Sequence, residues 1–446
     1  MDAVLLARIQ FAGTIIFHFI FAPLTIGLAW LIVWLMARYW KRGDDASRNL
    51  ARFWINLFAI SFAVGVATGF AMEFQFGTNW SKYSRYVGDI FGAPLAIEVI
   101  FTFFLESIVI AILLFGWDRV SRPAHFLASV LVAIGSTMSA FWILVANSWM
   151  QTPEGYILHN GRAEMTNFLH VVFTHSMIPR LLHTVDGALV TAAFFMLGIS
   201  AWFLRRGRQV ESFRITFIVA LVVAFLTSVG QLGTGHLSAW MVTRTQPEKL
   251  AAFEGLFKTQ AYAPLTLIGI PDPAHATLRY AIRVPSGLSL LAYFRPDATI
   301  KGLDRFPPDR WPPVVWTFYS FHAMFWLGML FIAFPLLGLF LWWRKQLYHN
   351  HAFLTAAWLL TPLPFLANEL GWVTAEMGRQ PWIVYHVLLT RDAVSISVPA
   401  VHVLLTTILF GAIYLTLFLF WALFFRREVS RRWEESAVEP LVKDAQ

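Results

Sequence analysis

Residues able to do chemistry stand together at the end of one apolar stretch, which begins near Ala352 and is long enough to cross a bilayer. On a helix with about 100° per residue, two carboxylates, a tryptophan and an arginine fall within one narrow arc: Glu369, Glu376, Trp372 and Arg379. A carboxylate at membrane depth is costly unless it is paired, protonated or bound to a metal. The chemistry open to this arc is therefore proton transfer or metal ligation.

Histidines, methionines and carboxylates also occur in other apolar stretches. With the topology given below, those in the outer half of the bilayer or near its middle are His18, Glu73, Glu98, Glu106, His183, Asp186, His322 and Met324. At matching depth, His183 and Met324 would make a six-coordinate haem iron, which suits electron transfer. The alternatives are a histidine hydrogen-bonded at a helix end and a methionine that fills a gap in the core. His18 is either a core histidine or a proximal haem ligand.

Glu98 and Glu106 lie two turns apart on one predicted helix, about 80° apart around its axis. That places both near one side of the helix, as the steps of a proton relay would be. The alternative is a protonated, hydrogen-bonded packing pair. For Glu376 a functional role is favoured, because its one obvious neutralising partner is Arg379, one turn away.

The composition places the chain in lipid, since 58% of its 446 residues are hydrophobic and 13% are charged. There is no cysteine, which excludes thiolate-ligated haems, iron–sulfur clusters held by cysteine and disulfides. His, Met and carboxylate remain as possible metal ligands. The net charge of +8 does not indicate nucleic-acid binding, because the basic residues cluster in short links between apolar stretches.

Apolar runs of spanning length predict an all-α, polytopic membrane protein with nine transmembrane helices, at Phe11–Met36, Trp54–Phe76, Ala93–Trp117, Phe126–Ser148, Leu181–Leu204, Ile215–Leu237, Val314–Trp343, Ala352–Glu376 and Val398–Phe425. The links after the first, third, fifth and seventh runs, together with the C-terminal tail, hold most of the basic residues. The positive-inside rule therefore predicts the N-terminus outside and the C-terminus in the cytoplasm.

One outer link is much longer than the others. Ser238–Pro313 is mixed in charge and rich in proline, and residues 247–260 (PEKLAAFEGLFKTQ) predict a short amphipathic helix. Such a loop could lie on the membrane surface and cover a site that opens to lipid, or it could be an ordinary linker. The chain thus divides into residues 1–237 with six spans, the outer loop 238–313, residues 314–425 with three spans, and a basic tail 426–446.

Longer motifs run through nearly all the spans in order: FQFGTNW (Phe74–Trp80), YVGDIFGAPLAIE (Tyr86–Glu98), GWDR (Gly116–Arg119), WILVANSWMQ (Trp142–Gln151) and GRQPW (Gly378–Trp382). They resemble subunit I of the cytochrome bd-type quinol oxidases. The resemblance implies a respiratory enzyme of the prokaryotic cytoplasmic membrane, which oxidises quinol at the outer face and reduces O2 to water with protons from the cytoplasm. It also implies a low-spin haem b, a high-spin haem b and a haem d in this subunit. The implied partners are a second polytopic subunit, with or without a third, single-helix one.

Carried over position by position, the resemblance implies that His183 and Met324 ligate the low-spin haem iron. His18 and Glu376 match the axial ligands of the two high-spin haems, and which of them holds haem d stays open. The remaining matches fall on the surroundings of these haems.

Arg379 and Trp372 match residues beside the high-spin haems. The acidic residues of the proton route match Glu98 and Glu106, with Ser139 and Asp118 as lesser candidates. The quinol-linked residues of the outer loop, which the family calls the Q-loop, match Lys249 and Glu254.

Two features depart from the better-known members. The Q-loop is short, which resembles the short-loop, often cyanide-insensitive branch, where a haem b can stand in place of haem d. His322 occupies a position that is otherwise Arg, and it adds a rival ligand near Met324. Residues two apart on a helix point about 200° apart, so both cannot face one iron, and Met324 is the predicted ligand.

Two other interpretations stay open. A polytopic transporter or channel would explain Glu98, Glu106 and Glu369 equally well, but it does not explain a His/Met pair and a His/Glu pair in one layer of the membrane. A membrane electron-transfer subunit that does not reduce O2 is the other. Visible colour in the purified protein would separate the haem proteins from the transporter.

Overall fold

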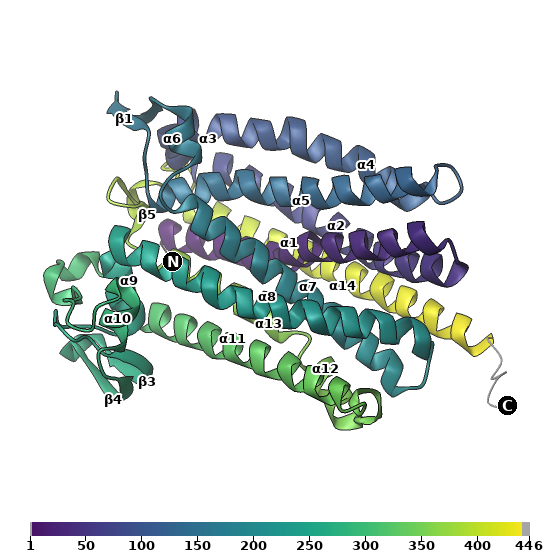
Figure 1. Cartoon of the computed structure of the whole chain (residues 1–446). Coiled ribbons are helices and arrows are strands. Elements are labelled where there is room, and N and C mark those ends of the chain that lie inside the picture. Colours follow the sequence, from purple (N-terminus) through teal and green to yellow (C-terminus); the bar gives the residue numbers. More distant parts are fainter. Residues whose placement is uncertain (1, 439–446) are drawn as a thin grey trace.

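Long helices make up most of the chain, because in lipid each backbone N–H and C=O must find its partner within the same segment. The computed structural model describes residues 2–438. Eight helical stretches are long and apolar enough to cross a membrane: α1 (Ala3–Arg42), α2 (Asp45–Thr78), Ser81–Phe115, α5 (Arg122–Gln151), α7 (Met177–Arg205), α8 (Val210–Thr245), α11 (Val314–Trp343) and α14 (Ala400–Val438). They lie side by side as a bundle of roughly parallel and antiparallel rods (Figure 1).

The stretch Ser81–Phe115 is continuous but changes its winding in the middle. It consists of α3 (Ser81–Ile97), a π-helical segment (Glu98–Phe103) and α4 (Phe104–Phe115). Pro94 lies in the last turn of α3, where its ring and missing N–H disturb the regular ladder. Glu98 is the first residue of the π-helical segment, so the irregular turn sets the direction of a candidate proton carrier.

The prediction of a single helix over Ala352–Glu376 is wrong. The structure has two helices there, α12 (His351–Leu359) and α13 (Leu363–Met377), joined by a tight turn. Pro362 follows Thr361 at the break, and the residue before a proline is pushed out of the helical region of φ and ψ. Among residues 2–438, therefore, eight stretches qualify as spans, and the ninth predicted span is in two pieces.

Strands and short helices cap one end of the bundle, where the N-terminus also lies, while α14 runs to the opposite end (Figure 1). The antiparallel pairs are β1 (Tyr156–His159) with β2 (Arg162–Met165), β3 (Leu265–Asp272) with β4 (Thr277–Val284), and β5 (Trp382–Val384) with β6 (Leu388–Leu389). The short helices of the cap are α6 (Phe168–Val172), α9 (Pro247–Glu254) and α10 (Gly287–Tyr293). Single 3-10 turns occur at Pro273–His275, Leu303–Arg305, Pro308–Arg310, Thr390–Asp392 and, at the other end of the bundle, Leu347–His349.

The amphipathic helix expected over residues 247–260 is shorter than predicted and does not lie on an outer surface. It is α9, which ends at Gly255 because that residue has φ +64°, a left-handed conformation that caps the helix. Its residues from Glu248 to Glu254 are all buried. The Phe253 ring stacks on the Phe321 ring of α11, with 4.2 Å between the ring centroids. The outer loop is thus fastened to the bundle through α9.

The largest apolar core forms where α7 crosses the middle of the bundle. The most apolar window of α7 is 89% buried, against 11% for α14, so α7 is central and α14 peripheral. Phe194 of α7 packs against Phe331 of α11 with ring centroids 5.0 Å apart. This core holds α1, α2, α7, α8 and α11 together and fixes the walls of the site described next.

Candidate functional site

One cavity of about 1020 Å³ runs between the helices toward the capped end of the bundle. It lies above the range of about 300–1,000 Å³ that is usual for a single small-molecule site. The main candidates assigned from the sequence to ligands, protons or quinol line it: His18, Glu98, Glu106, His183, Lys249, Glu254, Met324, Trp372, Glu376 and Arg379. They come from six helical stretches, with Ser81–Phe115 counted as one stretch, and from the turn after α13. The fold therefore brings together residues that are up to 361 positions apart (379 − 18).

His18 is held by a hydroxyl of the neighbouring helix α2. The Thr68 Oγ1 atom lies 3.0 Å from His18 Nδ1, and the same hydroxyl is 2.9 Å from the carbonyls of Val64 and Gly65. Because the threonine proton goes to a carbonyl, its oxygen accepts the N–H of Nδ1. That leaves Nε2 of His18 with a free lone pair. Gly69 lies beside the ring, where a Cβ would be in ordinary contact with Cε1 at 3.5 Å.

His183 is held in the same way by α8. Its Nδ1 lies 3.2 Å from Thr234 Oγ1, and a Cβ at Gly235 would lie 3.3 Å from its Cε1. The Nε2 atom has a long contact of 3.4 Å with the amide nitrogen of Gln231. A Thr–Gly pair on the adjacent helix thus lies against each histidine, a feature that the sequence interpretation missed because the sequence does not show which helix faces a given histidine.

Met324 and His322 have different surroundings on α11. The Sδ atom of Met324 faces Gly371 of α13, where a Cβ would lie only 2.9 Å from it. The ring nitrogens of His322 lie 2.9 Å from the Phe318 carbonyl and 3.1 Å from the Thr266 carbonyl. Each nitrogen of His322 thus faces a backbone carbonyl, with its one N–H donating to either of them, and Met324 remains the predicted ligand.

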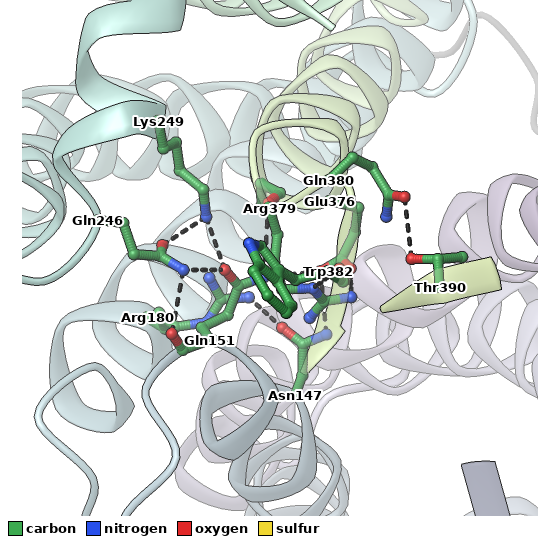
Figure 2. A network of polar contacts seen from close by, with 11 residues as sticks. Asn147, Gln151, Arg180, Gln246, Lys249, Glu376, Arg379, Gln380, Trp382 and Thr390 are labelled. Carbon is green, nitrogen blue, oxygen red and sulfur yellow. Dashed lines mark hydrogen bonds and ion pairs between the residues drawn. The ribbon is translucent and has the colours of Figure 1, made fainter. Parts of the chain in front are cut away.

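Glu376 is the centre of a polar network at the end of α13 (Figure 2). Its Oε1 accepts hydrogen bonds from Asn147 Nδ2 at 3.1 Å and from Gln151 Nε2 at 3.2 Å, both on the last turns of α5. Its Oε2 forms an ion pair with Arg379, whose side chain is 4% exposed. Arg180 of α7 donates in turn to the Asn147 side-chain oxygen.

Positive charge exceeds negative charge in this network. The two arginines Arg180 and Arg379 lie beside the single carboxylate of Glu376, with the Lys249 amine also close to it. Arg379 Nη1 and Arg180 Nε are buried and have no hydrogen-bond partner among residues 2–438. Buried cations with unused donors are costly, and Arg in particular matches carboxylate and phosphate groups. The network is thus suited to an anionic group.

Lys249 and Glu254 of α9 are both buried, and their pKa values are shifted in opposite directions. Burial and then the nearby Arg180 lower the pKa of Lys249 well below its ordinary value. Lys249 Nζ donates to the side-chain oxygens of Gln151 and Gln246, both at 2.6 Å. Burial raises the pKa of Glu254 to about 8, although the Thr266 amide donates to it and favours the carboxylate.

Glu98 and Glu106 each pair with a serine of α5. Ser139 Oγ donates to Glu98 Oε1 at 2.6 Å, and Ser136 Oγ donates to Glu106 Oε1. Glu98 is 9% exposed and Glu106 4%. The two carboxyl groups and the two hydroxyl groups thus form a row along the contact between α5 and the Ser81–Phe115 stretch.

Two candidates lie away from the cavity. Asp118 is 79% exposed and makes an ion pair of 2.7 Å with Arg48, at the end of the bundle opposite to the cap. Glu369 is absent from the cavity lining, and neither of its carboxylate oxygens has a hydrogen-bond partner within the described residues. The expected arc of α13 is therefore divided, since Trp372, Glu376 and Arg379 face the cavity and Glu369 does not.

Polar residues that the sequence interpretation did not single out complete the network. They are Asn147, Gln151, Arg180 and Gln246, while Thr68 and Thr234, which were also not singled out, contact the two histidines. Asn147 and Gln151 stand four positions apart at the end of an apolar helix, a spacing that puts both on one face. That spacing was available in the sequence, but their common target on α13 was not.

Comparison with known proteins gives one consistent result. A sequence model described as cytochrome bd terminal oxidase subunit I matches residues 6–432. The cytochrome bd ubiquinol oxidase subunit 1 of Bacillus subtilis (strain 168) is 41% identical over 441 residues, which cover 97% of this chain and 94% of the relative. The cytochrome bd-II ubiquinol oxidase subunit 1 of Escherichia coli (strain K12) is 37% identical over 461 residues, with 88% and 90% covered. The solved bd oxidase of Geobacillus thermodenitrificans superimposes with a TM-score of 0.89 at 32% identity, covering 96% of this chain and 99% of that one.

Proposed function

Because this chain belongs to the cytochrome bd terminal oxidase subunit I family, we propose that it is the haem-carrying subunit of a quinol oxidase. Members of the family are quinol:O2 oxidoreductases of respiratory chains. In this proposal quinol is oxidised at the outer face and protons are taken up from the cytoplasm. The observation that carries the proposal is the single cavity lined by His18, His183, Met324 and Glu376. Histidine and methionine are ligand types that haem iron accepts in a chain without cysteine, and the carboxylate of Glu376 is assigned from the match to the family.

The residues of the cavity fit haem groups in three respects. Each histidine has its Nδ1 beside a threonine hydroxyl, so the metal-binding atom would be Nε2, which in His183 has one long contact of 3.4 Å with the Gln231 amide nitrogen. Gly371 leaves space beside the Met324 sulfur. The unused donors of Arg180 and Arg379 suit propionate carboxylates.

In this assignment His183 and Met324 hold a low-spin haem b, and His18 and Glu376 hold a high-spin haem b and a haem d, or a haem b in place of haem d. When bound, the haems supply one-electron transfer and O2 reduction. Trp372 lies on the cavity wall near Glu376, and Arg379 holds the Glu376 carboxylate. Which of His18 and Glu376 serves haem d is a matter for the spectroscopy below.

Quinol oxidation is assigned to the outer loop. Oxidation of a quinol releases protons, so the site needs groups that can exchange protons near neutral pH. Burial lowers the pKa of Lys249 and raises that of Glu254 to about 8, so both pKa values move toward neutral pH. Both line the cavity from α9, which is packed into the bundle beside α11.

Proton delivery is assigned to the row of Glu106, Ser136, Ser139 and Glu98. The hydroxyl groups of α5 hold the two carboxyl groups on the cavity wall, where a proton can pass along hydrogen-bonding groups. Glu106→Gln should slow turnover by about tenfold or more, the effect of losing one positioned proton carrier, while its haem spectrum stays largely intact. Full turnover in this variant would remove Glu106 from the route.

The arrangement in the membrane follows from the same assignment. The chain is a multi-pass membrane protein. We place it in a prokaryotic cytoplasmic membrane, with α12 and α13 together as a ninth span, the capped end outside and the end of α14 in the cytoplasm. The proposed partners are a second polytopic subunit, with or without a single-helix one, since the relatives above are named as subunit 1 of their oxidases.

The decisive experiment is the dithionite-reduced minus air-oxidised absorption spectrum of the purified complex, combined with acid–acetone extraction of its haems. A far-red band together with an extractable chlorin would support the three-haem assignment with haem d. A b-type signal alone, with quinol-dependent O2 uptake, would keep the oxidase and replace haem d by haem b. A colourless protein would contradict the ligand assignments. It would favour the interpretation in which the buried carboxylates belong to a transporter.

A further inference from the structure

We infer that Gln151 is a positioning residue that couples the outer loop to the Glu376 carboxylate. Gln151 is the last residue of α5 and is fully buried, with 0% exposure. It stands between the lysine of α9 and the carboxylate at the end of α13 (Figure 2). The inference rests on the proposed function, in which Lys249 serves quinol and Glu376 ligates a haem.

The two ends of the Gln151 amide face opposite partners. Its Oε1 accepts from Lys249 Nζ at 2.6 Å and from Gln246 Nε2 at 3.0 Å. Its Nε2 donates to Glu376 Oε1 at 3.2 Å and makes a longer contact of 3.4 Å with the Ala375 carbonyl. A second bond from Gln246 to the Gln151 backbone carbonyl, at 3.0 Å, fastens the start of α9 to the end of α5.

The side chain at position 151 must accept on one side and donate on the other, which a neutral amide does. The oxygen must accept from the loop, and the nitrogen must donate to a carboxylate, so the orientation of the amide is fixed by its neighbours. A leucine at position 151 would make neither set. A glutamate could accept from Lys249 and Gln246, but it would place a second carboxylate against Glu376 and could not donate to it when ionised.

The bridge makes the two sites respond to one another. A change in the position of Lys249 moves the acceptor that also orients the donor to Glu376. Hydrogen bonds to a ligating carboxylate tune the metal that it holds. Gln151 therefore transmits changes at the quinol loop to the haem pocket on Glu376 without touching the His183 and Met324 pair.

The test compares Gln151→Leu and Gln151→Glu in the whole purified complex, with Gln75→Leu as the control. Gln75 is also a fully buried glutamine near the same end of the bundle, but its amide donates to Thr14 and is not in the network. Three quantities are measured for each variant: KM for a soluble quinol, the absorption spectrum of each haem, and hydrogen exchange of the α9 amides. The exchange measurement needs no turnover.

Gln151→Leu should raise KM by about tenfold, equivalent to about 1.4 kcal/mol, speed exchange in α9 and shift the spectrum of the haem on Glu376. Gln151→Glu should keep KM and α9 exchange near the wild-type values while shifting the same spectrum. Gln75→Leu should leave all three unchanged. The inference is overturned if Gln151→Leu changes only α9 exchange and KM, or only the haem spectrum. It is also overturned if both variants at position 151 give the same results. A wild-type complex without haem or without quinol-dependent O2 uptake would instead contradict the proposed function. Hydrogen exchange of α9 would still show whether Gln151 holds α9 in place.

Discussion

At the scale of single residues, the candidate ligands depend on hydroxyl groups one helix away. Thr68 and Thr234 each lie within hydrogen-bond distance of the Nδ1 of a histidine and so orient the ring whose other nitrogen is left for a metal. The residue types His18, His183, Met324 and Glu376 could be recognised in the sequence. Their threonine partners could not, because which helix faces a given histidine depends on how the helices are rotated in the bundle.

Thr68→Val and Thr234→Val should each weaken one haem site. Loss of such a partner typically costs about 10–100-fold in metal affinity, so Thr234→Val should reduce occupancy at His183 and Thr68→Val at His18. Haem content per protein and a potentiometric titration of each band measure this. Thr227→Val on α8 is the control, because its hydroxyl bonds only to the carbonyl of Val223 in its own helix. Equal losses in all three variants would contradict a specific orienting role.

The buried carboxyl of Glu254 should make the outer loop sensitive to pH. Its pKa is raised by burial from an ordinary 4.5 to about 8. Between these values an opened loop loses the Glu254 proton while the packed loop keeps it, so the opened state binds fewer protons and packing weakens as pH rises. The stabilisation is complete below pH 4.5 and lost as pH rises through about 8, by an amount on the order of a few kcal/mol. Hydrogen exchange of α9, corrected for intrinsic rates, should lose more protection with rising pH in the wild type than in Glu254→Gln, where the lowered pKa of Lys249 leaves packing that strengthens as pH rises. A fall of equal size in the variant would assign it to another group.

At the scale of elements, the apolar runs predicted the spans because length and composition suffice for that purpose. They did not predict the break at Pro362, where α13 starts afresh and acquires its own direction. The break matters for the site, because α13 carries Gly371, Trp372 and Glu376 to the cavity. The short strands of the cap were missed as well, since two to eight residues are too few for a clear pattern.

The contact between α11 and α13 should be sensitive to one methyl group. Gly371→Ala would place a Cβ 2.9 Å from the Met324 sulfur, which has to move away. We expect the low-spin haem to lose its methionine ligand, convert to a high-spin spectrum and lower quinol oxidase turnover by about tenfold, equivalent to about 1.4 kcal/mol. Electron paramagnetic resonance reports the spin state directly. Gly411→Ala in α14, which meets nothing within 4 Å, is the matched control, and an unchanged low-spin signal in Gly371→Ala would argue against Met324 as the ligand.

At the scale of the whole molecule, the distribution of basic residues predicts a definite sidedness. The cap that carries α9, β3 and β4 lies at the same end as the N-terminus, and the link between α4 and α5 lies at the opposite end (Figure 1). The arrangement within the bundle thus allows the predicted topology with the cap outside. The cavity shared by residues from α1 to α13 could not be drawn from the sequence, because it depends on all the helices at once.

The absence of native cysteine makes sidedness directly measurable. Lys301→Cys in the cap and Arg119→Cys at the opposite end both replace exposed residues. In intact spheroplasts, a membrane-impermeant maleimide should label the first and leave the second unlabelled until the membrane is opened. The reverse pattern would invert the topology, and the unsubstituted chain is the blank for both variants.

The surplus of buried positive charge has a consequence for how cells make this protein. A newly inserted polypeptide must bury Arg180 and Arg379 beside one carboxylate, and one nitrogen of each arginine finds no hydrogen-bond partner within residues 2–438. Such an uncompensated cluster opposes closure of the bundle until an anionic partner arrives. Cofactor insertion is then a step of biogenesis as well as of activation, since ligands that bind the folded form stabilise it. We expect haem-starved cells to hold the subunit as a loosely closed precursor that quality-control proteases remove, so that its abundance follows the haem supply.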